Sequence, residues 1–373
     1  MNFNKLSLEE KFGQMFVIGL DTYDINDEII ELIQKYKIGG VVLYKKNYTS
    51  IETMIEVVNK LKKINENNKI PLFISIDQEN GRVNRLPKDI LRISSALKQA
   101  KTKNMKVINA VNELTTYLLA STGVNMNFAP DLDIVRGDKN KAIGNRSYGS
   151  NVEDVIKYGL PFMKEMQKNN IISVVKHFPG HGATNKDSHF VIPKIKDIET
   201  LENEDVKVFE SAIKEGTDAI MVGHLILKGY GLKPATINKK IIDDYMKNKY
   251  KFKGLLVTDD LRMNTLRYIY GLKRSIQKSI EAGHNVLMIK YKKGDAKNLY
   301  KKLLKMVKFC EIDPELINES AKKIVAIKKK YKLINEPISS KLNIELINNK
   351  IKKINDVIDK ELGVSLWKLK TFF

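Results

Sequence analysis

The sequence predicts a (β/α)8 barrel, a closed ring of eight parallel strands surrounded by helices, followed by a short helical tail. Two observations lead to this fold class. Eight short apolar runs rich in β-branched residues alternate with amphipathic helical segments along most of the chain. Several of the runs are apolar without alternation, as expected of strands that are covered on both faces. The number of strands and the length of the chain fit one barrel domain.

The predicted strands follow one another at regular intervals. They are residues 16–20, 39–44, 71–77, 124–130, 173–178, 218–224, 254–260 and 285–289. Amphipathic stretches such as SIETMIEVVNKLKKI and LKRSIQKSIEAG lie between them. A doubly wound open sheet is the alternative, but the chain lacks the GxGxxG and phosphate-loop patterns that usually accompany it.

The predicted barrel domain covers residues 1–335 and ends with the helix DPELINESAKKIVAIKKKYKLI. Residues 336–373 form a helical tail rich in lysine and asparagine, which is too short to hold a second core. Its apolar stripe, with Trp367, Phe372 and Phe373, is expected to pack on the barrel or on a second subunit.

Composition narrows the classes of function. The chain carries a formal net charge of +21, but its lysines are scattered, and no nucleic-acid-binding motif accompanies them. A solvated basic surface is therefore favoured over nucleic-acid binding. The single cysteine, Cys310, allows no internal disulfide. Glu9 and Glu10 stand where a signal peptide would be apolar, and no apolar run is long enough to span a bilayer. A cytoplasmic protein without stable membrane insertion is expected.

Ionisable residues end several of the predicted strands. They are Asp77, Lys176, His177, His224, Asp259 and Asp260. In a (β/α)8 barrel the carboxyl ends of the strands meet around one cavity, where the chemistry takes place. The alternative is that each residue caps its strand, which is plausible for Asp260 but weak for the whole set.

The stretch KHFPGHGATNKDSH, residues 176–189, holds three of the five histidines. His177 and His181 have the spacing of two metal ligands on a helix, but Pro179 and Gly180 prevent a regular helix there, so a metal site is disfavoured. The glycines and the proline predict a tight loop after strand five. His181 either bonds the backbone of this loop or belongs to a catalytic site.

The end of this stretch suggests proton transfer. Asp187 lies two residues before His189 and can hold one ring nitrogen, which leaves the other nitrogen free to donate a proton. Asp259, at the end of strand seven, is the best partner. A carboxylate and an acid–base group at a barrel mouth are the apparatus for cleaving a glycosidic bond through a covalent intermediate.

Five motifs in order make the chain resemble glycoside hydrolase family 3, specifically its single-domain β-N-acetylglucosaminidases of peptidoglycan recycling. The motifs are DQENGRVNRL, NFAPDLDI, IGNRSYGS, KHFPGHGATNKDSH and VTDDLRM. The resemblance runs from LSLEEKFGQMFVIG to about Ile334. The chain departs from it at Asn80, where many relatives have glycine, and at Ala183, where they commonly have aspartate.

The resemblance implies a role for each matched residue. Asp259 matches the nucleophile, and Asp187 with His189 matches the acid–base dyad. Five residues match those that hold the sugar in the innermost subsite: Asp77, Arg85, Arg146, Lys176 and His177. For Arg146 a structural salt bridge is the alternative. No metal or organic cofactor is implied.

The implied activity is that of a retaining exo-β-N-acetylhexosaminidase. Its expected substrates are GlcNAc-containing muropeptides or chito-oligosaccharides, and it would act as a monomer or homodimer. An N-acetylglucosaminide phosphorylase and a β-glucosidase are alternatives on the same scaffold. A sugar-binding protein without activity is the alternative from another class.

Overall fold

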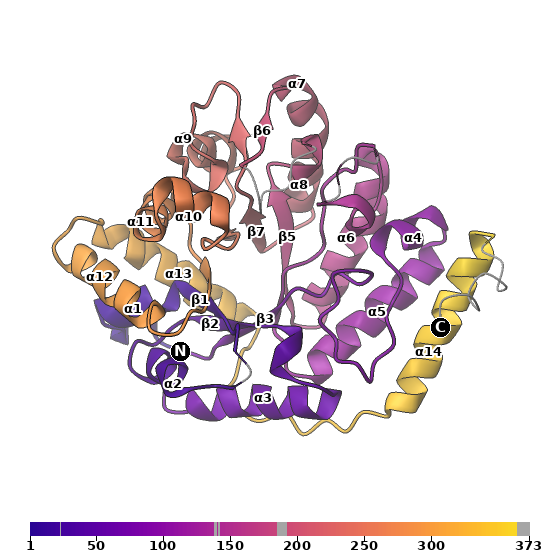
Figure 1. Ribbon diagram of the computed structural model, residues 1–373, viewed down its shortest axis with the longest axis horizontal. Coiled ribbons are helices and arrows are strands. Elements are labelled where there is room, and N and C mark those ends of the chain that lie inside the picture. The colour runs from indigo at the N-terminus through magenta and orange to yellow at the C-terminus, as the bar shows by residue number, and fades with distance from the viewer. Residues whose placement is uncertain (23, 138–139, 141, 185–191, 364–373) are drawn as a thin grey trace.

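The structure is a computed structural model that describes residues 1–22, 24–137, 140, 142–184 and 192–363. Eight parallel strands form a ring in the order β10-β1-β2-β3-β4-β5-β7-β9 (Figure 1). A parallel bridge between Val257 and Val286 joins the two ends of this order. The barrel predicted from the sequence is therefore confirmed.

Each strand of the ring lies within or overlaps one of the predicted apolar runs. The strands are β1 (Phe16–Gly19), β2 (Gly40–Leu43), β3 (Phe73–Ile76), β4 (Met126–Asn127), β5 (Ile172–Phe178), β7 (Ala219–Val222), β9 (Leu255–Thr258) and β10 (Leu287–Lys290). Every residue of seven of these strands is buried, and in β10 only Lys290 is exposed. This burial explains why the runs are apolar without alternation. A separate parallel pair, β6 (Lys194–Ile195) and β8 (Ile226–Leu227), lies outside the ring.

Helices surround the ring. They are α1 (Leu8–Gln14), α2 (Asp27–Gln34), α3 (Ile51–Ile64), α4 (Ala96–Lys101), α5 (Met105–Ser121), α6 (Val152–Lys168), α7 (Ile198–Thr200), α8 (Val206–Lys214), α9 (Lys239–Ile241), α10 (Asn264–Tyr270), α11 (Leu272–Ala282), α12 (Ala296–Lys308) and α13 (Pro314–Lys330). Side-chain caps define several of their starts. Ser7, for example, forms a capping box with Glu10 at the first turn of α1.

A buried lysine closes the end of the barrel where the strands begin. Lys328 of α13 has no exposed surface. Its Nζ donates to Gln14 Oε1 at 2.8 Å and to the carbonyl oxygens of Gly39 and Pro71 at 2.7 Å each. These three acceptors precede β1, β2 and β3, so one ammonium group ties α13 to three strands. All three donors of the ammonium group have an acceptor.

The helical tail packs on the barrel. Helix α14 (Ile344–Glu361) lies beside α5, at the right of Figure 1. Its Ile347, Ile351 and Ile358 are buried in one apolar cluster with residues of α5 such as Val111. The predicted packing therefore holds for α14, whereas Trp367, Phe372 and Phe373 lie outside the described residues. The domain boundary at residues 335 and 336 stays a prediction.

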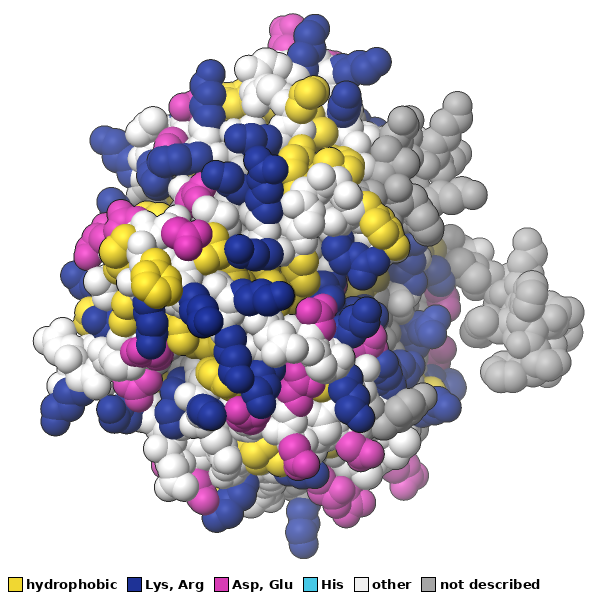
Figure 2. Space-filling model, turned by 60° about the vertical axis from the view of Figure 1, so that its left-hand side comes forward, with side chains coloured by type: hydrophobic (Ala, Val, Ile, Leu, Met, Phe, Trp, Pro, Cys, Tyr) yellow, Lys and Arg dark blue, Asp and Glu magenta, His cyan; other side chains and the backbone are white. Residues whose placement is uncertain are grey.

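The surface carries many basic side chains. Figure 2 shows Lys and Arg spread over the visible face and interspersed with Asp, Glu and apolar residues. Among the described residues, no helix combines the length and the apolar character needed to cross a membrane.

Candidate active site

A cavity of 810 Å³ opens at the carboxyl ends of the strands. Six of the eight site residues predicted from the sequence line it: Asp77, Arg85, Arg146, Lys176, His177 and Asp259. Asp260, His181 and Glu79 line it as well. The remaining two predictions, Asp187 and His189, lie outside the described residues.

Lys176 is a buried cation held between two carboxylates. Its Nζ lies 2.7 Å from Asp77 Oδ1 and 2.5 Å from Glu79 Oε1. Burial opposes the charge, but Asp77 and Glu79 outweigh it and raise the pKa of Lys176 above its ordinary value. The lysine therefore stays charged at the floor of the cavity.

Arg146 is paired just as firmly. Its Nε and Nη2 donate to the two oxygens of Glu79 at 2.7 and 2.8 Å, and its Nε lies 3.1 Å from Asp131 Oδ2. Burial favours the neutral form of Glu79, but Arg146 and Lys176 outweigh it and hold the pKa of this carboxyl well below its usual range. The sequence left two possible roles open for Arg146, sugar binding and a structural salt bridge. Arg146 forms the salt bridge, and it also lines the cavity.

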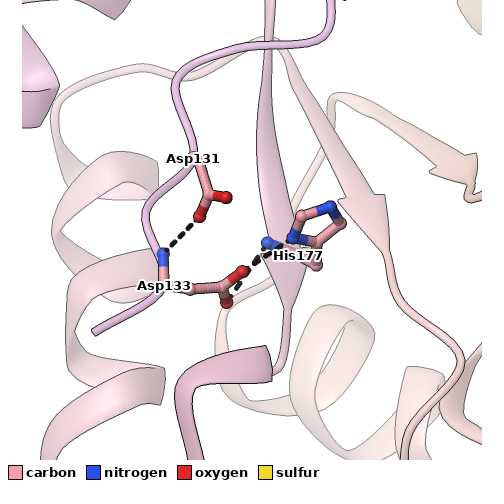
Figure 3. A group of neighbouring side chains, drawn as sticks. All are labelled: Asp131, Asp133 and His177. Carbon is pink, nitrogen blue, oxygen red and sulfur yellow. Dashed lines mark hydrogen bonds and ion pairs between the residues drawn. The ribbon is translucent and has the colours of Figure 1, made fainter. Parts of the chain in front are cut away.

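Asp133 fixes the ring of His177 (Figure 3). His177 Nδ1 donates to Asp133 Oδ2 at 2.7 Å, which leaves Nε2 3.5 Å from Arg146 Nη2. Asp133 is itself fixed, because its backbone N–H donates to Asp131 Oδ1 at 3.0 Å. Burial lowers the pKa of His177 to about 4. The ring is therefore neutral at neutral pH, so Nε2 is an acceptor, and its hydrogen bond with Arg146 is long enough for a ligand to replace it.

Asp131, Asp133 and His177 offer three ligand atoms within 4.8 Å of one another, the grouping of a possible cation site. Arg146 already pairs with Asp131, and Asp133 already accepts from the His177 ring and the His181 amide. These residues thus satisfy one another, with a guanidinium in the place of a metal ion.

The two acids that follow β9 differ in their surroundings. Asp260 Oδ1 accepts from the backbone N–H groups of Arg262 and Lys290 at 2.9 and 3.0 Å, which joins the loops after β9 and β10. Asp259 Oδ1 accepts only the Asp260 N–H, at 2.7 Å. No described residue bonds its second oxygen, which is free for a ligand.

The ionisation of these two acids also differs. Burial opposes ionisation of Asp259, but His224, His177 and the Asp260 amide outweigh it and lower the pKa of the carboxyl. Burial raises the pKa of Asp260. Of the two acids, Asp259 is thus the one whose surroundings favour the ionised form.

His224 departs from the expectation that the strand-end residues face the cavity. Its ring bonds Thr236 Oγ1 at 2.7 Å and the backbone oxygen of Asp260 at 3.1 Å, and it does not line the cavity. This histidine supports the backbone behind the acid pair.

Arg85 does line the cavity, and no described carboxylate pairs with its guanidinium.

Sequence reasoning did not assign Glu79, Asp131 and Asp133. A signal was present, because Glu79 follows Asp77 by two residues, and Asp131 and Asp133 stand two apart just after the fourth apolar run. Acids in alternate positions at a strand end place their side chains on one side.

Comparisons with known proteins agree with this geometry. The model of the "Glycosyl hydrolase family 3 N terminal domain" matches residues 7–327. A protein named "Beta-hexosaminidase" from Vibrio cholerae is 32% identical over 269 residues, which are 72% of this chain and 79% of that protein. A "Beta-hexosaminidase" from Psychromonas ingrahamii is 28% identical over 279 residues, 73% of this chain and 81% of that protein.

Solved structures agree as well. The structure of a glycoside hydrolase family 3 beta-N-acetylglucosaminidase from Paenibacillus sp. matches with a TM-score of 0.87 and 28% identity, covering 94% of this chain and 68% of that chain. The chain therefore belongs to glycoside hydrolase family 3 and is a glycoside hydrolase.

Proposed function

We propose that this glycoside hydrolase is a retaining exo-β-N-acetylhexosaminidase that removes terminal β-linked GlcNAc. The observation that carries the proposal is the convergence of five polar side chains with Asp259 on one cavity. The names of the relatives, which share 28% and 32% identity with the chain, support the sugar specificity.

Asp259 is proposed as the nucleophile. It keeps one carboxylate oxygen without a described partner, and its pKa is lowered, so it is ionised and accessible. Attack on the anomeric carbon forms a covalent glycosyl-enzyme and breaks the bond to the leaving oxygen. Asp260 suits the role less well, because its Oδ1 already accepts two backbone amides.

The sugar is proposed to lie against Asp77, Arg85, Arg146, Lys176 and His177. Asp77 accepts paired hydroxyls, whereas the arginines and the lysine donate to ring oxygen substituents. The Nε2 atom of His177 accepts from a hydroxyl. Most of these groups are already fixed by Glu79, Asp131 and Asp133, so little ordering is needed when the sugar binds.

Asp187 and His189 are proposed as the acid–base dyad. His189 would protonate the leaving oxygen and then take a proton from water, which attacks the glycosyl-enzyme and returns Asp259 to its free form. The order of motifs along the sequence supports this assignment.

Peptidoglycan-derived fragments are the proposed natural substrates, with chito-oligosaccharides as the alternative, and the proposed location of the enzyme is the cytoplasm. The first test is turnover of nitrophenyl β-GlcNAc beside nitrophenyl β-glucoside, with and without phosphate. The proposal expects hydrolysis of the GlcNAc compound that does not depend on phosphate. Preference for the glucoside, or turnover that requires phosphate, would assign the enzyme to one of the two alternative activities.

A second test addresses the nucleophile. A 2-deoxy-2-fluoro glycosyl probe should label Asp259, as mass spectrometry of the digested protein would reveal. Asp259→Asn should fold normally and lose turnover. Asp260→Asn is the matched control, because it removes the neighbouring carboxylate and should still be labelled at Asp259. A label on Asp260 would overturn the assignment.

A further inference from the structure

His181 is a buried histidine whose two ring nitrogens lack a hydrogen-bond partner among the described residues. It lies in the short helical turn His181–Ala183, three residues after β5, and only 3% of it is exposed. Within the part of the chain that the structure describes, neither Nδ1 nor Nε2 has a hydrogen-bond partner, although His181 lines the cavity that holds Asp259. Buried polar side chains in folded proteins are almost always bonded, so a ring with both nitrogens free calls for an explanation.

The backbone around His181 is firmly held. Its N–H donates to Asp133 Oδ1 at 2.6 Å, and Asn140 Nδ2 donates to its carbonyl oxygen at 3.3 Å. A Cβ added to Gly182 would lie 1.8 Å from the carbonyl oxygen of Ile134, so the turn packs directly against backbone. The ring is therefore positioned by its own main chain, and both of its nitrogens are buried without a partner among the described residues.

One carboxylate places two histidine rings. Asp133 accepts the His177 ring through Oδ2 and the His181 amide through Oδ1. The two rings lie edge to face, with their centroids 6.0 Å apart. His181 therefore belongs to the same rigid unit as a residue already proposed to bind the sugar.

The state of the ring limits what it can bind. Burial lowers the pKa of His181 to about 4, so at neutral pH the ring offers one donor and one acceptor. A hydroxyl group and a secondary amide each offer both roles too. A sugar that carries hydroxyl and acetamido groups matches this ring better than an anion or a cation does.

We propose that His181 is a further substrate-binding residue, whose neutral ring bonds a hydroxyl or the acetamido group of the sugar held beside Lys176 and His177. The proposal rests on the proposed function for the identity of the sugar. In the free protein no described residue forms a hydrogen bond with the ring nitrogens, and the ligand supplies a partner. An unpaired polar group kept at a binding site lowers the stability of the free protein, as functional sites often do.

The deciding experiment replaces His181 by leucine and by glutamine. His181→Leu removes both unpaired nitrogens at similar volume, so the thermal midpoint should stay the same or rise, while kcat/KM on nitrophenyl β-GlcNAc should fall about 10-fold or more. His181→Gln keeps a donor and an acceptor and should recover part of the loss. If the His181 ring had only a structural role, His181→Leu would show the opposite pattern. Its thermal unfolding midpoint would fall, and its kcat/KM would stay within about 2-fold of wild type.

His284 provides the matched control. It has no exposed surface, and no described residue forms a hydrogen bond with its Nε2, but it does not line the cavity. Burial lowers its pKa to about 4, as for His181. His284→Leu should leave kcat/KM within about 2-fold of wild type, since it changes a buried histidine away from the ligand. An equal loss in both variants would overturn the proposal.

Binding separates this inference from the proposed function. Calorimetry with free N-acetylglucosamine and with glucose should give a dissociation constant for one of them that rises about 10-fold in His181→Leu. If wild-type protein binds a sugar but does not cleave the GlcNAc compound, the proposed function fails and the His181 inference is judged by binding alone. Sugar binding that is unchanged in His181→Leu overturns the inference, and wild-type protein that neither cleaves nor binds overturns both.

Discussion

Glu79 and Arg146 form a two-point ion pair, with Nε–Oε2 and Nη2–Oε1 distances of 2.7 and 2.8 Å. Both side chains lie at the cavity and are largely buried, and Glu79 also contacts Lys176 at 2.5 Å. One carboxylate therefore fixes two of the cations that face the proposed sugar site. Glu79 supports the site from behind even though it has no role of its own in the proposed reaction.

Glu79→Gln is expected to weaken both folding and activity. It removes a buried negative charge between two buried cations, which should cost about 3 kcal/mol of unfolding free energy. The released side chains of Arg146 and Lys176 should lower kcat/KM by about 10-fold or more, since misplaced binding groups weaken the transition state. Urea denaturation and steady-state kinetics measure the two effects.

Glu204 offers the control for this change. It pairs with Arg136 at 2.5 Å, but 43% of its side chain is exposed. Glu204→Gln should therefore cost less than about 1 kcal/mol and leave the kinetics unchanged. Equal costs for the two variants would mean that the Glu79 pair is no stronger than a surface pair.

Much of the fold could be predicted, because strands covered on both faces must be apolar throughout and such runs stand out in a sequence. Four of the predicted cavity residues, Asp77, Lys176, His177 and Asp259, could be predicted for a similar reason, since ionisable groups rarely end buried strands without a use. Arg85 and Arg146 end no predicted strand and were expected only from the family resemblance. The pairing of Glu79 with Arg146 and of Asp133 with His177 could not. Each pair joins segments at the ends of two neighbouring strands that are far apart in the sequence, and the partners meet only when those strands pair in the fold.

The two neutral histidines predict a pH dependence of stability. Burial lowers the pKa of His177 and His181 to about 4, from an ordinary value of 6.5. Between pH 6.5 and 4 the unfolded chain binds protons on these rings that the folded chain does not, so the contribution of the rings to stability falls as the pH falls. Asp131 and Asp133 contribute with the opposite sign, because burial raises the pKa of each to about 7, and the His181→Leu comparison isolates the part that belongs to one ring. His181→Leu should therefore lose less stability than wild type between pH 7 and about 4.5, by up to about 3 kcal/mol. Parallel pH profiles of the unfolding free energy would contradict this.

Lys328→Met is expected to destabilise the barrel and to leave the catalytic activity of the folded protein unchanged. It leaves Gln14 Oε1 and the carbonyl oxygens of Gly39 and Pro71 without their donor. Unpaired buried acceptors cost about 1–3 kcal/mol each, so a loss of about 3 kcal/mol or more is expected in urea denaturation. The lysine lies at the end of the barrel opposite the cavity, so kcat/KM of the folded protein should stay unchanged. A large loss of kcat/KM would mean that the two ends are coupled.

Helix α14 is expected to stabilise the domain on which it packs. Ile351 is 1% exposed against α5, whereas Leu346 on the same helix is 52% exposed. Ile351→Ala should cost about 2–5 kcal/mol, because it leaves a cavity in an apolar cluster. Leu346→Ala should cost less than about 0.5 kcal/mol. Similar values for both variants in urea denaturation would show that the tail contributes little to folding.

The proposed acid–base role of His189 predicts a dependence on the leaving group. His189→Ala removes the proton donor, so hydrolysis of substrates with poor leaving groups should slow severely. Substrates with good leaving groups, such as dinitrophenyl glycosides, need little protonation, so formation of their glycosyl-enzyme should suffer much less. Asp187→Ala should show a milder form of the same pattern, because the ring remains but loses its partner. Azide attacks the glycosyl-enzyme without a general base and should rescue the second step of His189→Ala. Equal losses of hydrolysis rate on both kinds of substrate, with no rescue by azide, would mean that His189 has a structural role. The acid–base role would then belong to another histidine at the cavity, and His181 would be the first to test.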